Sequence, residues 1–197
     1  MKNFIGRKQE LKKLTEWDSS SSRLVAIYGR RRVGKTRMVE EAFRQNRLIK
    51  FEGIEGHSQK QGIEEFVRQL SVNFQKPSLA SGKYKKWIEV WQLLSDMLHE
   101  EPAIVFFDEL QWMLGEKAKP IGELKHAWDN YFRKKNKIQL VLCGSVSSFM
   151  VKKVLRSKPL YGRVDLEVNL QPLRFPEIRP LFKARSIYEC VELYMSI

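Results

Sequence analysis

The sequence has few cysteines and no long apolar run. It contains 197 residues but only 2 cysteines, Cys143 and Cys190, which excludes a disulfide framework and fits a reducing cytosol. No apolar run approaches the roughly 18–20 residues that a membrane-spanning helix needs. The first residues, MKNFIGRKQELKKL, also lack the apolar stretch of a signal peptide. We therefore expect a cytoplasmic protein without a membrane segment.

Acidic residues are scarce relative to basic ones. The 23 Asp and Glu face 36 Lys and Arg, which gives a formal net charge of +13 at pH 7. Such an excess attracts polyanions, so nucleotides, DNA or an acidic protein are the partners that the charge favours. The alternative is a basic surface that only faces solvent. With 43% hydrophobic residues the chain can still bury an ordinary core, and its length fits one domain.

Short apolar runs alternate with stretches of helical periodicity. The runs RLVAIYG, LIKFEGI, AIVFFDE and IQLVLCGS are apolar nearly throughout, as in parallel strands that are covered on both faces. Helices are predicted for residues 35–45, about 59–76 and about 84–98, and again after Pro120. Trp87, Trp91 and Leu94 share one helical face, which favours core packing. The pattern predicts a three-layer α/β sandwich with a mainly parallel sheet.

A phosphate-binding motif follows the first predicted strand, in the stretch YGRRRVGKTRMVE. Gly29, Gly34, Lys35 and Thr36 satisfy G-x-x-x-x-G-K-[ST], with a predicted strand before them and a predicted helix after them. The glycines allow successive backbone N–H groups to point at one anion, and the helix start adds its positive dipole end. Lys35 is expected to reach the β- and γ-phosphates, and the Thr36 hydroxyl to ligate Mg²⁺.

Three consecutive arginines, Arg30–Arg32, lie inside this motif. Backbone N–H groups form the cradle in such a loop, so we expect these side chains to point away from the phosphates. They would then form a basic rim that meets an acidic surface, another subunit or a further domain. The alternative is that they pair with nearby acids, such as Glu40, Glu41 or Glu52, and only hold the loop in shape.

Polar residues also end two other predicted strands. Asp108 and Glu109 close AIVFFDE, where the aspartate can hold Mg²⁺ opposite Thr36 and the glutamate can orient or deprotonate an attacking water. Ser145 closes IQLVLCGS and could bond the γ-phosphate or that water. The alternative for each is a helix N-cap, a position that Asp and Ser favour.

Several stretches together resemble a known family. FIGRKQELKKL, YGRRRVGKT, FFDELQWM, and GSVSSFM followed by PLYGRVDLEVNLQPLRF, are similar in that order to motifs of the archaeal-type ATPases in the AAA+/STAND branch of P-loop NTPases. The resemblance covers residues 1 to about 183. It implies a P-loop ATPase domain at residues 1–172 and the beginning of a helical lid at residues 173–197, with the rest of the lid beyond the last residue.

The resemblance also implies ATP as the nucleotide and adds residues to the site. Phe4, Ile5 and Gly6 would lie beside the adenine, Arg7 belongs to the same box, and Ser145 would be the sensor on the neighbouring strand. For Arg163 it implies a phosphate-sensing or intersubunit role. The residues expected at the nucleotide are Phe4, Ile5, Gly6, Arg7, Gly29, Arg30, Arg31, Arg32, Val33, Gly34, Lys35, Thr36 and Arg37. Those expected at the metal are Thr36 and Asp108, and those expected in catalysis are Lys35, Glu109, Ser145 and Arg163.

We therefore predict a Mg²⁺-dependent ATPase module that acts as a nucleotide switch and can oligomerise when it binds nucleotide.

A first alternative function is a DNA-binding protein that uses ATP only as a conformational ligand. It is favoured by residues 151–185, which hold nine Lys or Arg and three Asp or Glu. A second alternative function is a kinase for a small molecule. It is disfavoured by Glu109, because a water-activating glutamate would hydrolyse ATP in place of transferring its phosphate to the small molecule.

Overall fold

In a computed structural model of the chain, five strands form one parallel sheet. The structure describes residues 4–98, 101–115, 118–135, 137–145, 147–179, 186 and 189. The strands run in the spatial order β2-β3-β4-β1-β5, and every neighbouring pair is parallel. Their bounds are β1 Arg23–Tyr28, β2 Leu48–Glu52, β3 Ala103–Asp108, β4 Ile138–Gly144 and β5 Leu166–Asn169. The mainly parallel sheet expected from the sequence is confirmed.

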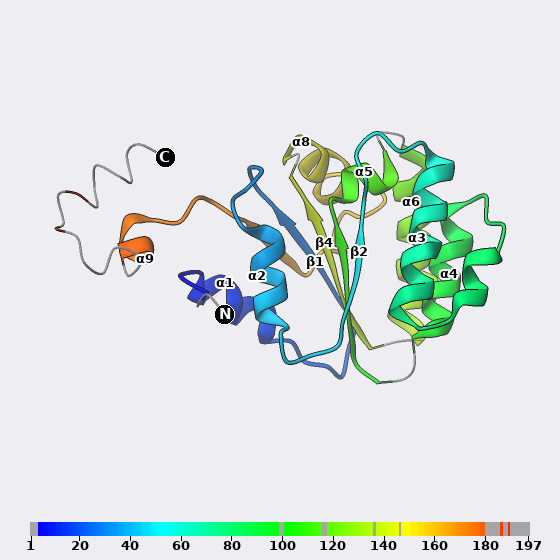
Figure 1. Cartoon of the computed structure of the whole chain (residues 1–197), viewed down its shortest axis with the longest axis horizontal. Helices are drawn as coiled ribbons and strands as arrows, with labels where there is room; N and C mark the ends of the chain where they lie inside the picture. The colour runs from blue at the N-terminus through cyan, green and yellow to red at the C-terminus, as the bar shows by residue number, and fades with distance from the viewer. Residues whose placement is uncertain are drawn as a thin grey trace.

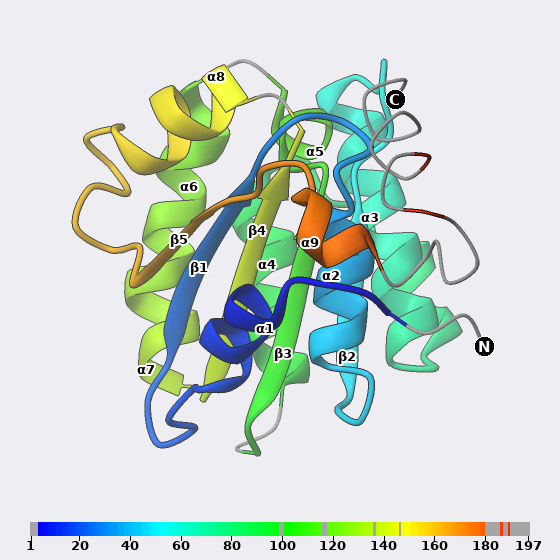
Figure 2. The same cartoon turned by 90° about the vertical axis from the view of Figure 1, so that its left-hand side faces the viewer.

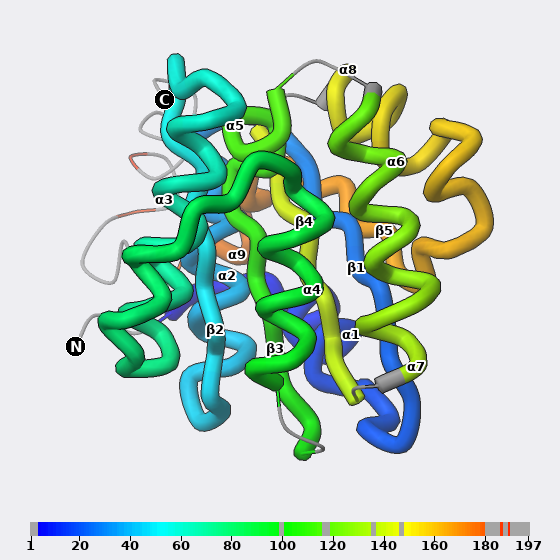
Figure 3. Tube along the Cα trace, turned by 90° about the vertical axis from the view of Figure 1, so that its right-hand side faces the viewer, coloured from blue at the N-terminus to red at the C-terminus, as the bar shows by residue number. Residues whose placement is uncertain are grey.

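Helices cover both faces of this sheet, which makes three layers (Figure 1). One face carries α1 and α2 (Figure 2), and the other carries α3, α4 and α6 (Figure 3). The longer helices are α1 Lys8–Thr15, α2 Lys35–Ala42, α3 Gln59–Asn73, α4 Trp87–Met97 and α6 Ala118–Ala127. The shorter ones are η1 Pro77–Ser81, α5 Leu110–Leu114, η2 Trp128–Phe132, α7 Arg133–Lys135, α8 Ser147–Phe149, η3 Met150–Leu155 and α9 Phe175–Ile178. The predicted α/β sandwich is therefore the observed architecture.

The side chains of each central strand alternate between two separate apolar clusters. On β3, Val105 and Phe107 pack in the larger cluster under α3, α4 and α6, whereas Ile104 and Phe106 pack in the smaller one under α1 and α2. A strand that is buried on both faces needs apolar side chains in both directions. This is why the strand sequences read as continuous apolar runs. The next residue in the α2-facing series of β3 is Asp108, at the carboxyl end of the strand.

Aromatic side chains fill the larger cluster. Trp87 and Trp91 are fully buried, and their rings stack with centroids 5.4 Å apart. Phe66 stacks on Phe51 at 4.2 Å and meets Trp87 edge to face at 5.8 Å. Because large aromatic rings remove much apolar surface from water, this cluster fixes α3 and α4 against the sheet. The prediction that Trp87, Trp91 and Leu94 pack in the core is confirmed.

One predicted element differs from the structure, and another lies mostly outside the described residues. The helix after the phosphate motif was expected to reach residue 45, but α2 ends at Ala42, because Phe43 turns into the buried cluster and Asn46 N–H bonds the Phe43 carbonyl in a tight turn. Of the helical lid expected at residues 173–197, the structure describes α9, whereas most residues after 179, Cys190 among them, lie outside the described residues. In the described part of the chain, no helix combines the length and apolarity needed to cross a membrane.

Candidate functional site

The phosphate motif forms the turn between β1 and α2, at the carboxyl edge of the sheet. Gly29 has a φ of 153°, and a Cβ on it would lie 2.2 Å from the Leu170 carbonyl oxygen, so this position excludes a side chain. Gly34 adopts a left-handed φ of 92° immediately before α2 begins at Lys35. Glycine reaches both conformations at little cost. Because α2 begins at Lys35, its first backbone N–H groups have no acceptor within the helix and are available to an anion in the loop.

Lys35 supplies the positive charge of this loop. The side chain is only 5% exposed, and its Nζ donates hydrogen bonds of 3.0 Å to the carbonyl oxygens of Gly29 and Arg30. These two bonds hold the ammonium against the backbone of the loop. A buried lysine without a carboxylate partner in its own loop is suited to compensate the charge of a bound anion.

Thr36 and Asp108 meet across the two strand ends. The Thr36 hydroxyl donates a 2.9 Å hydrogen bond to Asp108 Oδ2, and the Asp108 carboxylate is almost fully buried. Oδ1 of the same carboxylate accepts a bond of 3.1 Å from the Glu109 N–H. A hydroxyl and a carboxylate in contact are the oxygen donors that Mg²⁺ prefers, with water and phosphate completing its shell. The two residues therefore fit the metal ligands expected from the sequence.

Glu109 turns back toward β4. Its backbone is left-handed, with φ 49° and ψ 52°, a region that non-glycine residues seldom adopt. Glu109 Oε2 accepts bonds of 3.1 Å from the Ser145 N–H and 2.7 Å from the Ser145 hydroxyl. Gln111 Nε2 donates a third bond to the same oxygen, at 2.5 Å. Although Glu109 precedes α5, its side chain makes no capping bond to that helix.

Gln111 is a site residue to which the sequence assigned no role. It is 7% exposed, and its Nε2 also donates to the Ser145 hydroxyl at 3.1 Å. Among the described residues, its Oε1 has no hydrogen-bond partner although it is buried. Glu109, Gln111 and Ser145 thus form one polar cluster at the ends of β3 and β4. The available signal was the glutamine in FFDELQWM, a polar residue inside an otherwise apolar helical turn.

Arg7 connects the N-terminal box to the phosphate loop. Arg7 as a whole is only 5% exposed. Its guanidinium donates hydrogen bonds to the carbonyl oxygens of Val33, at 3.2 Å, and Gln171, at 2.5 Å. The Arg7 backbone N–H donates to Glu177 of α9 at 3.0 Å. One residue thereby joins the loop, the segment after β5 and α9. Of its neighbours in the box, Phe4 packs against the smaller cluster, and Ile5 and Gly6 are half-buried.

The three loop arginines are exposed. Arg31 lies 3.5 Å from Glu55 and 5.0 Å from the centre of the Trp112 ring. Among the described residues, the side chains of Arg30 and Arg32 have neither a hydrogen-bond nor an ion-pair partner. One arginine thus pairs with an acid, though none of the acids expected from the sequence. Arg37 is also exposed and lies 4.0 Å from Glu40.

Arg163 lies in an ion pair away from the loop. Its guanidinium donates two bonds to Asp129, at 2.9 and 3.0 Å, and Lys125 lies 2.9 Å from the same carboxylate. These bonds, the Arg163 bonds foremost, hold the pKa of Asp129 below its usual range. No contact in the described part of the chain brings Arg163 to Lys35 or Asp108. Of the residues expected in catalysis, the structure brings Glu109 and Ser145 into contact, whereas Lys35 bonds the backbone of its own loop and Arg163 bonds Asp129.

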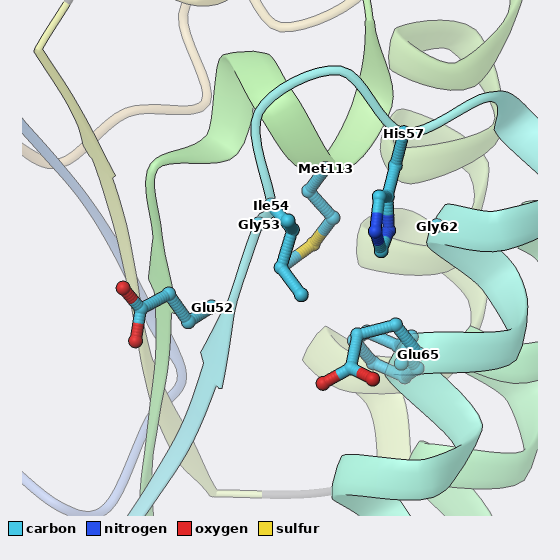
Figure 4. Close-up of a pocket in the computed structure, with 8 residues that line it drawn as sticks. Glu52, Gly53, Ile54, His57, Gly62, Glu65 and Met113 are labelled. Carbon is cyan, nitrogen blue, oxygen red and sulfur yellow. The ribbon is translucent and has the colours of Figure 1, made fainter.

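A small cavity lies behind the connection between β2 and α3 (Figure 4). Its volume is about 10 Å³, which accommodates roughly one water molecule. His57, Glu65 and Met113 are among the residues that line it, and His57 Nδ1 is buried without a partner among the described residues. The cavity is too small for a nucleotide, so it does not compete with the phosphate loop as the candidate site.

Comparison with known protein families gives a match over nearly the whole chain. Residues 4–192 match a family described as an ATPase domain predominantly from Archaea. An uncharacterised protein of Methanocaldococcus jannaschii is 31% identical over 193 residues. That alignment covers 97% of this chain but only 41% of the relative, so the chain spans less than half of the relative's length.

Solved structures show the same fold. A Walker-type ATPase of Pyrococcus abyssi superposes with a TM-score of 0.62 at 24% identity, over 91% of this chain and 58% of that one. The ORC1 protein of Aeropyrum pernix, solved in complex with DNA, superposes with a TM-score of 0.64 at 15% identity, over 93% of this chain and 50% of that one. At these identities the likeness concerns the fold alone.

Proposed function

Because the chain belongs to the family of ATPase domains that occur predominantly in Archaea, we propose that it is the nucleotide-binding module of a Mg²⁺-dependent ATPase that acts as a switch. The observation that carries this proposal is the hydrogen bond between Thr36 and Asp108. It connects the phosphate loop on β1 to the acidic end of β3. A loop that only bound phosphate would not need that carboxylate.

The loop binds the triphosphate of ATP. The backbone N–H groups at the start of α2 bond the phosphate oxygens, and the Lys35 ammonium compensates their charge. The bonds of Lys35 to the Gly29 and Arg30 carbonyls keep this charge inside the loop before nucleotide arrives. Arg7 stabilises the loop through the Val33 carbonyl, and the N-terminal box approaches the nucleotide from that side.

Thr36 and Asp108 are the residues that would hold Mg²⁺, directly or through water. A bound Mg²⁺ supplies positive charge to the phosphate oxygens and aligns the terminal phosphate. Glu109 accepts a proton from the attacking water as the water oxygen forms a bond to the terminal phosphorus. The bond between that phosphorus and the bridging oxygen breaks, so the products are ADP and phosphate. Glu109 is thus the catalytic base in this proposal.

The contacts of Glu109 support a switch. Ser145 and Gln111 place three hydrogen-bond donors on one oxygen of Glu109, so the carboxylate is directed to β4 and not into open space beside the loop. Hydrolysis then requires Glu109 to exchange at least part of these bonds for a water. Ser145 would sense the terminal phosphate by giving up its bond to Glu109. Nucleotide state and the position of Glu109 are thereby coupled.

The proposal is tested by titrating a fluorescent ATP analogue into the wild-type protein and Lys35→Ala, with and without Mg²⁺. A charged hydrogen-bond partner contributes roughly 1.5–3 kcal/mol, so we expect the variant to bind about 10- to 100-fold more weakly. Arg44→Ala, which removes an exposed cation of an ion pair with Glu41, is the matched control and should bind as the wild type does. Equal affinity of wild type and Lys35→Ala would refute the nucleotide assignment.

A second candidate is a DNA-binding protein in which ATP only sets the conformation. It is supported by the exposed cations Lys152, Arg156 and Lys158 at η3 and the turn that follows. Phosphate release measured with and without duplex DNA separates the two functions. Hydrolysis that DNA does not change favours the ATPase module, whereas DNA binding without hydrolysis favours the second candidate.

A further inference from the structure

Lys50 is a half-buried lysine on the edge strand β2. Ile49 and Phe51 face the larger cluster, so Lys50 lies on the other face, beside α2. Its register partner on β3 is Phe106, and its Nζ lies 5.7 Å from the centre of that ring. The apolar stem can therefore cover the Phe106 ring while the ammonium continues toward the carboxyl end of β3, where Asp108 lies.

Three carboxylates surround the ammonium of Lys50. Its Nζ is 3.3 Å from Glu40 on α2, 3.5 Å from Asp108 Oδ2 and 3.9 Å from Glu52. Figure 4 shows the Glu52 carboxylate turned away from His57 and Glu65. Each of these three carboxylates lies close enough to favour the charged form of the lysine. Lys50 is therefore a charged ammonium.

The three carboxylates differ in how much they need this cation. The side chains of Glu40 and Glu52 are 38% and 59% exposed, so water can solvate them. Asp108 is 4% exposed, and its Oδ2 is the same oxygen that accepts the Thr36 hydrogen bond. A buried carboxylate needs a partner far more than an exposed one. Lys50 is therefore the counter-charge of the carboxylate to which the proposed function assigns the metal.

We propose that Lys50 is a built-in competitor of Mg²⁺ at Asp108, which raises the concentration of Mg²⁺ that the site needs. This inference rests on the proposed function, because it assumes that Thr36 and Asp108 hold the metal. The ammonium satisfies Asp108 in the nucleotide-free protein and opposes a second cation there. Glu40 and Glu52 lie within reach of Nζ and can retain the ammonium when Asp108 takes another partner. Lys50 is thus a positioning residue and takes no part in the chemistry.

The experiment measures the Mg²⁺ concentration that half-saturates binding of the fluorescent ATP analogue. Lys50→Met keeps an apolar stem over Phe106 but removes the charge, whereas Lys50→Arg keeps the charge. We expect the half-saturating Mg²⁺ concentration to fall roughly three- to tenfold in Lys50→Met, as for loss of one partly screened charge, and to stay near the wild-type value in Lys50→Arg. Lys60→Met is the control, because Lys60 is 83% exposed and pairs only with Glu64 in the described structure.

A second readout needs no nucleotide. Removing Lys50 leaves Asp108 without its cation, so Lys50→Met should melt at a lower temperature than the wild type. Mg²⁺ should raise its melting temperature more than that of the wild type, at matched ionic strength. An unchanged or higher Mg²⁺ requirement in Lys50→Met would overturn the competition. That outcome would leave the proposed metal site intact. Wild-type nucleotide binding that does not respond to Mg²⁺ would instead overturn the proposed metal site and this inference with it, so the two failures give different results.

Discussion

At the scale of the residue, Glu109 carries the expected chemistry, and its replacement by glutamine gives the first prediction. The amide of Glu109→Gln has the size of the carboxylate, and its oxygen can still accept the bonds from Ser145. It cannot accept a proton from water. We expect ATP binding within about twofold of the wild type and hydrolysis slower by roughly 100-fold or more, the usual contribution of a general base.

Phosphate release at saturating ATP and titration of the fluorescent analogue check this prediction. Glu41→Gln is a matched control, because Glu41 lies on α2 and pairs with the exposed Arg44. Wild-type and Glu109→Gln proteins that release phosphate at the same rate would show that another group activates the water.

The loop arginines give a second prediction at this scale. Arg30, Arg31 and Arg32 are all exposed, and Arg31 contacts Glu55 and Trp112. Screened charges near a surface contribute about 1 kcal/mol or less, so replacing all three with Gln should weaken ATP binding by no more than about fivefold. The same analogue titration checks it, with circular dichroism as the test of folding. A folded triple variant that binds as poorly as Lys35→Ala would show that an arginine bonds the phosphates directly.

The sequence predicts some residues of the candidate site but not others. The motif and the two strand-end runs were sufficient to nominate Lys35, Thr36, Asp108 and Ser145, because strand ends of a parallel sheet share one edge. Lys50 was not nominated. Its only signal is a charge in the run LIKFEGI, and that signal gains meaning only when the register places Lys50 beside Phe106 and Asp108.

At the scale of the element, α9 and the segment after β5 depend on Arg7. Its guanidinium bonds the Val33 and Gln171 carbonyls, and its backbone bonds Glu177. Lysine keeps the charge but lacks the planar fork that serves two carbonyls together. We predict that Arg7→Lys loses about 2 kcal/mol, because a buried acceptor stays unpaired, and melts roughly 4–8 °C lower. Nucleotide affinity should also fall, because the loop loses its bond at Val33.

Thermal melts with and without ADP measure both effects. Arg68→Ala removes an exposed arginine whose two bonds to Glu65 lie on the surface of α3, so it should change the melting temperature little. If Arg7→Lys melted and bound nucleotide as the wild type does, the bonds of Arg7 would be incidental to the loop.

At the scale of the whole molecule, the order of the strands was the part that the sequence could not supply. Apolar runs predict where each strand lies along the chain, but no local sequence pattern indicates that β4 lies between β1 and β3 in the sheet. That order arises from packing between segments far apart in sequence, such as the pairing of Val25 with Val141 and of Phe106 with Val141. It separates the phosphate loop from Asp108 by one strand, and it places Ser145 between them.

The charge of the whole molecule gives the last prediction, which concerns DNA. Lys152, Arg156 and Lys158 are exposed at η3 and the turn after it, and long exposed cations of this kind contact DNA phosphates, which carry no sequence information. We therefore expect duplex DNA to bind without sequence preference and more weakly as salt rises, since each phosphate contact releases counterions. Replacing the three residues with Gln should lower the slope of log affinity against log salt by as much as about 2.7, at roughly 0.9 per contact. The matched control replaces Lys60, Lys83 and Lys85, exposed lysines on the α3–α4 side, with Gln. Filter binding of two unrelated duplexes at rising salt measures the slopes, and an affinity that stays flat with salt, or falls equally in the control, would exclude this surface as the DNA contact.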